Sequence, residues 1–314
     1  MPLDPKVQAM FAAADQLPVV LEGGERAQAS AGMLRRNNPT QGPLDFPGVR
    51  VTDHILENEG RGIPLRIYQP DGPGPYATLV NFHGGGWVLG NFALDDMRCA
   101  RIVAESGVMI VSVDYRLAPE DPFPAALMDG VAVLRWAAGG GARFSADPAR
   151  LGVTGSSSGG NIAAGLALFC RDQGTPRLAF QMLNYPVMDA SLDWQSYRDF
   201  GTGFGTSRDM MAWFWDMYAG NADRSDPYMA PLCAKDLSGL PATFIITAEC
   251  DVLRDEGEAY AARLKAAGVP TVLARYDGMP HGFLTLPLAL PERDAAIDMS
   301  IRQIKAQLLP TVAD

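Results

Sequence analysis

The stretch Leu151-Gly-Val-Thr-Gly-Ser-Ser-Ser-Gly-Gly-Asn-Ile-Ala-Ala-Gly-Leu-Ala-Leu168 decides the fold of this chain. Its first four residues form a short apolar run typical of a buried strand, and the residues from Gly160 onward have the composition of a helix. Between them lies Gly155-Ser-Ser-Ser-Gly159, the one Gly-x-Ser-x-Gly pattern in the sequence. A serine on so sharp a turn from strand to helix holds its hydroxyl exposed above the sheet. The stretch therefore predicts an α/β sheet with Ser157 as a nucleophile at its edge.

The two glycines of this turn support the prediction. A Cβ atom at Gly155 or Gly159 would clash with the neighbouring strand and helix, and glycine has none. The helix N-terminus beneath Ser157 also favours negative charge that develops during a reaction. Ser156 and Ser158 lack glycines at the two required offsets, so neither is the candidate nucleophile. The alternative interpretation of the turn is a serine-rich helix cap without chemistry.

Outward from this turn, short apolar runs alternate with longer helical ones. The runs with the composition of strands are the paired edge strands Val51–Leu56 and Pro64–Tyr68 and the buried strands Ala77–Phe82, Val108–Val113, Leu151–Thr154, Phe180–Leu183, Thr243–Ala248 and Thr271–Tyr276. Helices are expected over Ala93–Ser106, Pro124–Ala138, Ser158–Asp172, Leu253–Ala267 and from Pro291 onward. This alternation predicts a doubly wound, mostly parallel sheet of about eight strands, flanked by helices.

Two segments fall outside the alternation. Residues 1–48 are helical in pattern but precede the first strand, and residues 188–235 separate two consecutive predicted strands. We expect these segments to form the two parts of a helical cap over one end of the sheet. Residues 49–187 and 236–314 would then be the two parts of the α/β core. The alternative is that both segments are unrelated additions to the surface.

A run of glycines follows the strand that ends at Phe82. In His83-Gly-Gly-Gly-Trp87, three consecutive glycines leave backbone N–H groups unshielded, so that an oxyanion can approach them closely. Acyl-transfer chemistry needs such donors because negative charge grows on the carbonyl oxygen of the substrate. We expect the N–H groups of Gly84, Gly85 and Ser158 to form an oxyanion hole. The spacing of the glycines fits neither a P-loop nor a dinucleotide fingerprint.

Only one of the three histidines is placed to act as a general base. His54 lies in the first strand pair, and His83 belongs to the glycine loop. His281 follows directly after the last predicted strand, where the loop can bring its imidazole to a serine at the same edge of the sheet. Elimination therefore selects His281.

The carboxylate that orients this base is expected after the preceding strand, Thr243–Ala248. Glu249, Asp251 and Asp255 all follow that strand, and position alone does not choose between the first two. Asp255 falls inside the next predicted helix and is the least suited. The chain order of serine, acid and histidine is the order that this kind of fold uses.

Together these motifs resemble those of the bacterial hormone-sensitive-lipase-like esterases, a family with the α/β-hydrolase fold. The resemblance runs over nearly the whole chain and rests on His83-Gly-Gly-Gly-Trp87, Asp114-Tyr-Arg-Leu-Ala-Pro-Glu120, Pro122-Phe-Pro-Ala125, Asp251-Val-Leu-Arg-Asp255 and His281-Gly-Phe283. It implies a serine carboxylesterase that hydrolyses small esters with short to medium acyl chains. It also implies that the acid is Asp251, the first aspartate of its motif, so that Ser157, Asp251 and His281 form the catalytic triad.

The turn departs from the family's usual Gly-Asp-Ser-Ala-Gly-Gly, because Ser156 replaces the aspartate and Ser158 the alanine. The backbone N–H of residue 158 does not depend on its side chain, so the resemblance still implies an active enzyme. An amidase, a lactonase or a carbamate hydrolase such as an arylformamidase would use the same triad. A non-catalytic receptor on the same fold is a further alternative, but plant hormone receptors that resemble this family lose the histidine that is present here as His281.

The second insertion carries a wide apolar helical face that includes Met211, Phe214 and Trp215. Such a face most often packs against a core. Its functional interpretation is the wall of an acyl or alcohol pocket, which flexible methionine side chains can fill. On that interpretation we expect these three residues, together with Trp87 and Phe283, to contact the substrate.

The composition fits a globular enzyme that acts on a small molecule. The formal charge of the 314 residues is −10 without any run of lysine and arginine, so no nucleic-acid partner is expected. No stretch approaches the ~20 apolar residues of a membrane span, and residues 1–21 lack the apolar core of a signal peptide. We expect no metal or other cofactor, and the sequence leaves a homo-oligomer open. The cysteines lack metal-ligand spacing and are expected to be buried free thiols in a reducing cytoplasm: Cys99, Cys170, Cys233 and Cys250.

Overall fold

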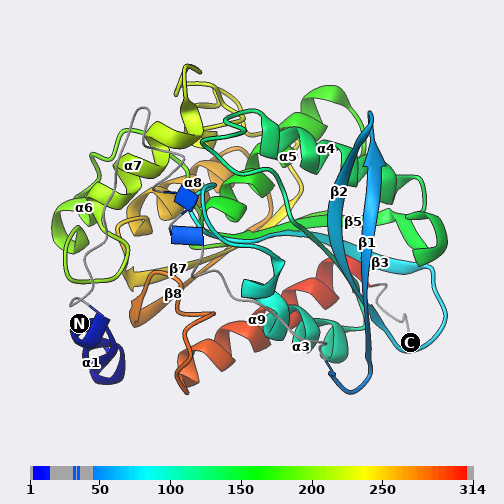
Figure 1. Cartoon of the computed structure of the whole chain (residues 1–314), viewed down its shortest axis with the longest axis horizontal. Helices are drawn as coiled ribbons and strands as arrows, with labels where there is room; N and C mark the ends of the chain where they lie inside the picture. The colour runs from blue at the N-terminus through cyan, green and yellow to red at the C-terminus, as the bar shows by residue number, and fades with distance from the viewer. Residues whose placement is uncertain (1–2, 15–30, 33, 36–44, 310–314) are drawn as a thin grey trace.

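In the computed structural model, which describes residues 3–14, 31–32, 34–35 and 45–309, strands form one sheet in the order β1-β2-β4-β3-β5-β6-β7-β8 (Figure 1). β2 pairs antiparallel with β1 and β4, and all the other pairings are parallel. The predicted mostly parallel sheet is therefore confirmed. The strands are β1 (Val49–Asn58), β2 (Arg61–Pro70), β3 (Tyr76–Phe82), β4 (Met109–Val113), β5 (Ala146–Ser156), β6 (Phe180–Asn184), β7 (Ala242–Cys250) and β8 (Thr271–Pro280).

Helices cover both faces of the sheet. Figure 1 shows α4, α5 and α8 on one face and α3 and α9 on the other. The helices are α1 (Pro5–Ala14), α3 (Asp96–Ser106), α4 (Ala125–Ala138), α5 (Ser158–Gln173), α6 (Gln195–Phe200), α7 (Arg208–Ala219), α8 (Arg254–Ala266) and α9 (Pro291–Leu308), with the short 3₁₀ helices η2 (Phe92–Asp95), η3 (Ala142–Phe144) and η4 (Pro231–Cys233).

The apolar runs of the central strands reflect this double cover. Every residue of β3, β4 and β6 is buried, because side chains on both faces of these strands pack against helices. Successive side chains of a strand point to opposite faces. In β7, for example, Ile245 belongs to one hydrophobic core, and Phe244 and Ile246 belong to the other.

Two strand predictions were wrong in detail. Pro64–Tyr68, predicted as an edge strand, belongs to β2 and lies inside the sheet between β1 and β4. Thr271–Tyr276, predicted as buried, belongs to β8, which is the last strand of the sheet and leaves Val272 37% exposed. An apolar run indicates that a strand is partly buried, but the order of the strands depends on pairing with distant segments, which the run does not encode.

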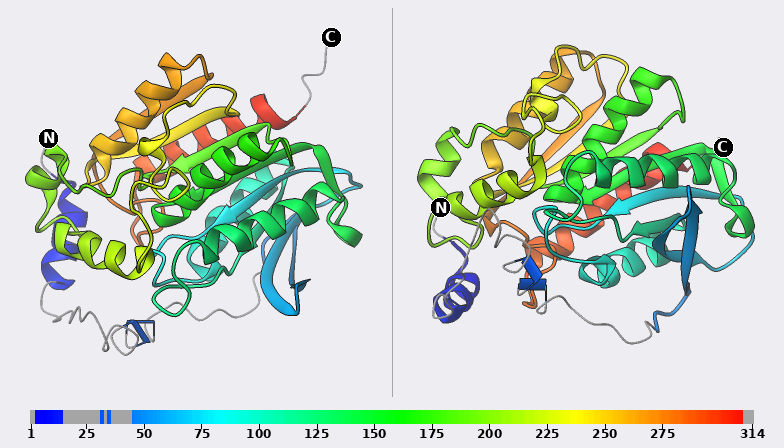
Figure 2. Two further views of the ribbon diagram at one scale, coloured as in Figure 1. Left: turned by 90° about the horizontal axis from the view of Figure 1, so that it is seen from above. Right: turned by 45° about the horizontal axis from the view of Figure 1, so that its top comes forward.

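Helix α1 of the first predicted cap segment lies on the same side of the molecule as α6 and α7 of the second (Figures 1 and 2). Residues 188–235 contain α6, α7 and η4. Much of the segment 1–48 falls outside the described residues, but α1 is described. Its Phe11 ring packs closely on Gly205, because a Cβ at Gly205 would lie 2.8 Å from the ring. Arg35 donates hydrogen bonds to the carbonyl oxygens of Val88 and Ala118, each at 2.6 Å.

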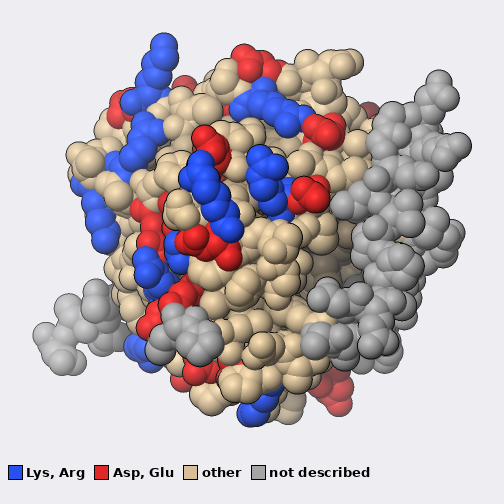
Figure 3. Space-filling view, turned by 90° about the vertical axis from the view of Figure 1, so that its left-hand side faces the viewer, with Lys and Arg blue, Asp and Glu red and all other residues tan. Residues whose placement is uncertain are grey.

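The described surface carries mixed charge. On the face in Figure 3, positive and negative side chains lie next to one another rather than in separate areas. Within the described ranges, no helix is long and apolar enough to cross a membrane. Three cysteines are buried as predicted, but Cys233 is exposed because it ends η4 at the surface.

Candidate active site

The carboxyl ends of the parallel strands bring the candidate residues together. Ser157 follows β5, Asp251 follows β7, and His281 follows β8. The glycine loop follows β3, the strand next to β5. Ligands of open α/β sheets bind at this edge, where the strand order reverses, and here the reversal lies between β3 and β5.

Ser157 is held in a strained backbone conformation at the start of α5, with φ 58° and ψ −121°. Such a conformation costs a non-glycine residue about 1–3 kcal/mol and persists only where its surroundings enforce it. Here the Ser157 N–H donates to the carbonyl oxygen of Asn184 at 2.9 Å. A Cβ at Gly155 would lie 2.2 Å from the Gly159 oxygen, and a Cβ at Gly159 would lie 2.0 Å from the Phe82 oxygen. The close approach of three backbone segments therefore fixes the turn.

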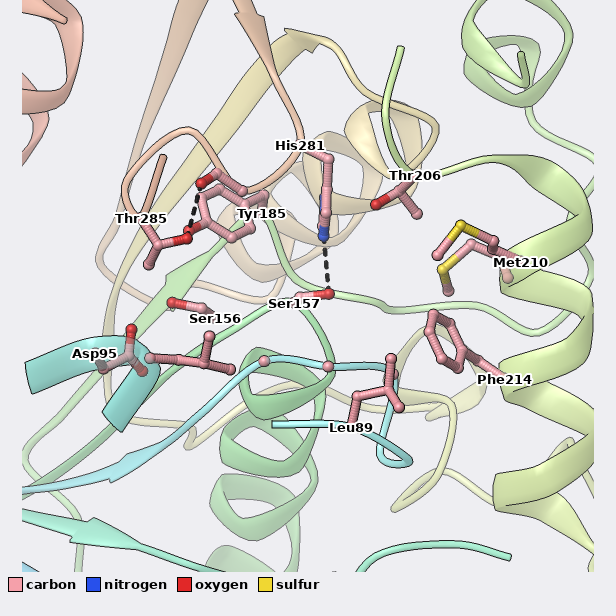
Figure 4. Close-up of a pocket in the computed structure, with 16 residues that line it drawn as sticks. Leu89, Asp95, Ser156, Ser157, Tyr185, Thr206, Met210, Phe214, His281 and Thr285 are labelled. Atoms are coloured by element: carbon pink, nitrogen blue, oxygen red, sulfur yellow. Dashed lines mark hydrogen bonds between the residues drawn. The ribbon is translucent and has the colours of Figure 1, made fainter. Parts of the chain in front are cut away.

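A continuous chain of hydrogen bonds joins the three candidates. His281 Nε2 lies 2.9 Å from Ser157 Oγ (Figure 4), and His281 Nδ1 lies 2.8 Å from Asp251 Oδ2. A carboxylate only accepts hydrogen bonds, so His281 Nδ1 carries the proton and donates a hydrogen bond to Asp251. Nε2 then has a free lone pair toward Ser157 Oγ. This arrangement can take a proton from the serine hydroxyl while the buried carboxylate stabilises the imidazolium.

Of the three candidate carboxylates at the end of β7 and the start of α8, only Asp251 forms a hydrogen bond with His281. Asp251 is 1% exposed, and its Oδ1 accepts a hydrogen bond from the Leu253 N–H at 2.9 Å, which fixes the carboxylate. Glu249 accepts from the Gly278 N–H at 2.7 Å. Asp255 accepts from the Ser196 N–H at 2.8 Å. Glu249 therefore binds the backbone of β8, and Asp255 binds the backbone of α6.

The glycine loop passes directly beside Ser157. A Cβ at Gly84 would lie 3.2 Å from the Ser156 carbonyl oxygen and 3.5 Å from Ser157 Cβ, so the loop packs closely against the turn. Gly84 and Gly85 line the cavity above Ser157, and Ser158 is the first residue of α5. None of the hydrogen bonds within the described residues uses the N–H groups of Gly84, Gly85 or Ser158. These donors are therefore available to a substrate oxygen.

The two other histidines have no access to Ser157. The His54 ring packs against Trp136 with the centroids 5.9 Å apart. His83 is fully buried, and burial lowers its pKa to about 4, so its imidazole is neutral. Its Nδ1 lies 2.7 Å from the Gly84 carbonyl oxygen, so this neutral ring braces the glycine loop.

The cavity above Ser157 has a volume of about 230 Å³. Pockets for drug-sized ligands have ~300–1,000 Å³, so this one suits a small molecule. Helix α7 supplies one wall through Met210, Met211 and Phe214 (Figure 4). Two of the residues that were expected to contact the substrate, Met211 and Phe214, thus line the cavity.

The other three, Trp87, Trp215 and Phe283, do not line it. The Trp87 ring is buried beneath α7, stacked on Tyr218 with the centroids 4.2 Å apart and 4.7 Å from the Trp215 ring. Phe283 is fully buried against Tyr185, with the centroids 5.9 Å apart. These rings join α7 and the last loop to the core, because their large apolar surfaces are better buried than left at a partly open pocket.

Sequence reasoning missed several residues of the cavity. The position of Tyr185 directly after β6 could have indicated it, since the ends of the parallel strands meet at this edge. Six more of the missed residues lie in loops or in η2 and carry no such signal: Leu89, Leu94, Asp95, Thr206, Gly282 and Thr285. Across the described ranges, no group of three or more His, Cys, Asp or Glu side chains is placed to hold a metal ion.

Comparison with known proteins agrees with this geometry. The family model that matches residues 79–285 describes an alpha/beta hydrolase fold. The match spans more than half of the chain, and the chain belongs to this α/β-hydrolase family. The family resemblance predicted from the motifs is therefore confirmed.

Individual relatives are esterases over nearly the full length of the chain. Carboxylesterase NlhH of Mycobacterium tuberculosis is 35% identical over 316 aligned positions, which cover 98% of this chain and 96% of the relative. Ethyl acetate hydrolase of Pseudomonas putida is 34% identical over 85% of this chain and 86% of its own. Among solved structures, a thermostable esterase from Pseudomonas putida ECU1011 superposes with a TM-score of 0.88 and is 37% identical, covering 99% of both chains.

Proposed function

We propose that this chain is a serine carboxylesterase that hydrolyses small esters with short to medium acyl chains. The observation that carries the proposal is the hydrogen-bonded chain from Ser157 through His281 to Asp251 beside the glycine loop. The relatives named carboxylesterase and ethyl acetate hydrolase support the ester bond as the target. The small cavity favours short acyl and alcohol groups over long lipid chains.

In the proposed reaction, Ser157 Oγ attacks the ester carbonyl carbon while His281 Nε2 takes the hydroxyl proton. The negative charge moves to the carbonyl oxygen, which accepts hydrogen bonds from the N–H groups of Gly84, Gly85 and Ser158. The tetrahedral intermediate then breaks the bond to the alcohol oxygen, and the imidazolium gives its proton to that oxygen. This leaves an acyl group on Ser157.

Water completes the cycle by the same steps in the same order. His281 takes a proton from the water molecule as its oxygen attacks the acyl carbon, and the second tetrahedral intermediate expels Ser157 Oγ, which recovers its proton from the imidazolium. The acid is released. Asp251 holds the imidazole in the required tautomer throughout and stabilises its charged form.

The segments 1–48 and 188–235 act as a cap in this proposal. The support is that α7 supplies a wall of the cavity and that α1 contacts the loop before α7 through Phe11 and Gly205. We also propose a reducing cytoplasm as its location, which the free thiols of the four cysteines support.

Turnover of p-nitrophenyl esters by the Ser157→Ala variant tests the proposal. We expect a loss of several orders of magnitude with an unchanged thermal transition, because the nucleophile is removed from an otherwise intact site. Ser158→Ala is the matched control: it keeps the backbone N–H and should stay within about tenfold of wild type. An acyl series from acetate to decanoate measures chain-length preference, and matched p-nitroanilides test the amidase alternative. Activity that survives in Ser157→Ala would refute the proposal.

A further inference from the structure

The cavity above Ser157 has two sides of different chemistry. Figure 4 shows Ser157 and His281 at the centre, with Met210, Phe214 and Leu89, and one polar residue, Thr206, on one side. On the other side the labelled residues are all polar: Asp95, Ser156, Tyr185 and Thr285. Proton transfer and oxyanion stabilisation in the proposed reaction use none of these four side chains, so their presence beside the serine calls for another explanation.

Tyr185 is the strongest indication that a ligand group binds there. Its side chain is 2% exposed, and its hydroxyl makes no hydrogen bond of normal geometry within the described residues, although the Ser156 hydroxyl lies close enough to interact with it. The buried hydroxyls of Tyr197, Tyr218 and Tyr260 are similar, but among these four tyrosines only Tyr185 lines the cavity. Its ring packs edge-on against His281, with the centroids 5.0 Å apart. A buried polar group without a partner costs roughly 1–3 kcal/mol, which a bound hydrogen-bonding group would recover.

Electrostatics keeps this hydroxyl neutral and places charged neighbours around it. Burial raises the pKa of Tyr185 most strongly, and the negative charge of Asp95 raises this pKa further. The positive charge of Arg98 and the interaction with the Ser156 hydroxyl lower the pKa. Tyr185 therefore remains an O–H group that can both donate and accept a hydrogen bond.

Asp95 supplies an acceptor on the same side. It is 1% exposed, and its Oδ1 lies 2.9 Å from the Arg98 guanidinium. Its Oδ2 accepts a hydrogen bond from Asn81 at 3.2 Å. Each carboxylate oxygen has two lone pairs, so accepting capacity remains. Because Arg98 balances the charge of Asp95, this side of the cavity is polar but close to neutral.

Two further hydroxyls complete the polar side. Ser156 Oγ lies 3.4 Å from the Asn184 amide nitrogen, a long contact that leaves its own proton unassigned. Thr285 donates to the Gly282 carbonyl oxygen at 3.1 Å, so its oxygen can still accept. The polar side thus offers both donors and acceptors within one small cavity.

We propose that this polar side, formed by Asp95, Ser156, Tyr185 and Thr285, binds a neutral hydroxyl group on the substrate, so that the preferred substrates are hydroxylated small esters. The proposal rests on the proposed esterase function. A hydroxyl can donate to the Asp95 carboxylate and accept from the Tyr185 hydroxyl at the same time. An alkyl group would leave the Tyr185 hydroxyl without a partner, whereas Asp95 keeps its contacts with Arg98 and Asn81 in either case.

Isosteric ester pairs that exchange a methyl group for a hydroxyl test this proposal. One pair varies the acyl group: p-nitrophenyl isovalerate against p-nitrophenyl β-hydroxybutanoate. The other varies the alcohol: propyl butanoate against ethylene glycol monobutanoate. In at least one pair we expect wild-type kcat/KM to favour the hydroxylated ester by about threefold to tenfold, the range for one or two net hydrogen bonds.

Two tyrosine variants assign the preference to the polar side. Tyr185→Phe should bring the ratio of the favoured pair close to one. Tyr260→Phe, which removes a hydroxyl that is equally buried but lies away from the cavity, should leave the ratio unchanged. A wild-type ratio of one in both pairs, or a ratio that Tyr185→Phe does not lower, would overturn the proposal. If p-nitrophenyl isovalerate and propyl butanoate, which lack the hydroxyl, were still hydrolysed in a Ser157-dependent way, the proposed esterase function would stand without the proposed hydroxyl site.

Discussion

The carboxyl ends of the strands and helix α7 both line the cavity above Ser157, but different parts of the chain set the geometry of these two regions. At the strand ends, backbone atoms set the geometry: a Cβ at Gly155 or Gly159 would meet carbonyl oxygens at 2.2 and 2.0 Å. On α7, side chains set the wall, through Met210, Met211 and Phe214. Backbone constraints of the first kind leave almost no tolerance for substitution, whereas the side chains of the second kind can change without moving the main chain.

The two regions touch at one junction. The Phe214 ring lies over Gly86 so closely that a Cβ there would be 2.3 Å from the ring. Beneath this contact Trp87 stacks on Tyr218 of α7. The glycine loop that is proposed to supply the oxyanion donors is therefore anchored to the helix that shapes the pocket. We infer that the strand ends determine the chemistry and α7 determines which small ester fits.

The largest expected effect lies at the strand ends, in Asp251→Asn. This change keeps the shape of the side chain but removes the charge and permits the wrong imidazole tautomer, so kcat/KM should fall about ten-thousand-fold without unfolding. Asp255→Asn and Glu249→Gln are the matched controls and should have much milder effects, since both carboxylates bind backbone elsewhere. Collapse of Glu249→Gln alongside an active Asp251→Asn would move the acid to Glu249.

Gly159→Ala tests whether backbone contact fixes the turn. The new Cβ would lie 2.0 Å from the Phe82 carbonyl oxygen, which cannot move without distorting β3. We expect the free energy of unfolding in urea to fall by about 3 kcal/mol or more. Gly139→Ala, at a residue with φ −78° after α4, should change it by less than about 1 kcal/mol. Equal stability of the two variants would contradict the backbone account.

Stability below neutral pH should report on His83 beneath the glycine loop. The unfolded histidine takes up a proton below its ordinary pKa of 6.5, but burial holds the folded pKa at about 4. The unfolded state therefore binds more protons in this window, and stability falls as the pH drops from about 6.5 to about 4, by roughly 3 kcal/mol in total. When urea unfolding is measured at several pH values, the His83→Asn variant should lack this decrease in the free energy of unfolding between about pH 6.5 and pH 4. An identical pH dependence in both proteins would mean that His83 is not buried in its neutral form.

The smallest of these effects is expected on α7. Met211→Ala removes part of the cavity wall and should shift the acyl-length optimum toward longer chains, with changes of about tenfold in relative kcat/KM. Met217→Ala makes the same chemical change on the same helix but away from the cavity, so it should lower stability and leave the optimum in place. If both variants shifted the optimum equally, α7 would act through overall packing and not as a wall.

The sequence was most informative where chain order and backbone constraint determine position. The alternation of apolar runs predicted the sheet, and because the parallel strands end at one edge, Ser157 and His281 could be placed without further information. The choice between Glu249 and Asp251 could not be made from position, since it depends on how the loop after β7 turns, and the family motif was needed.

The pocket could be predicted only in part. Met211, Phe214 and Trp215 share one apolar helical face, but which of them meets the cavity depends on the rotation of α7 against the core. Trp215 packs inward on Trp87, so it does not line the cavity. Asp95 is brought to the cavity by the loop before η2, and no local pattern predicts such a position.

We infer that the strained turn presents Ser157, and no neighbouring serine, as the nucleophile. Treatment with a fluorophosphonate, followed by proteolysis and mass spectrometry, tests it directly, because such a reagent bonds covalently to an activated serine and mimics the first tetrahedral intermediate. We expect one adduct per chain, on Ser157, that appears in parallel with loss of esterase activity and is absent from Ser157→Ala. An adduct on Ser156 or Ser158, or inactivation without an adduct on Ser157, would contradict it.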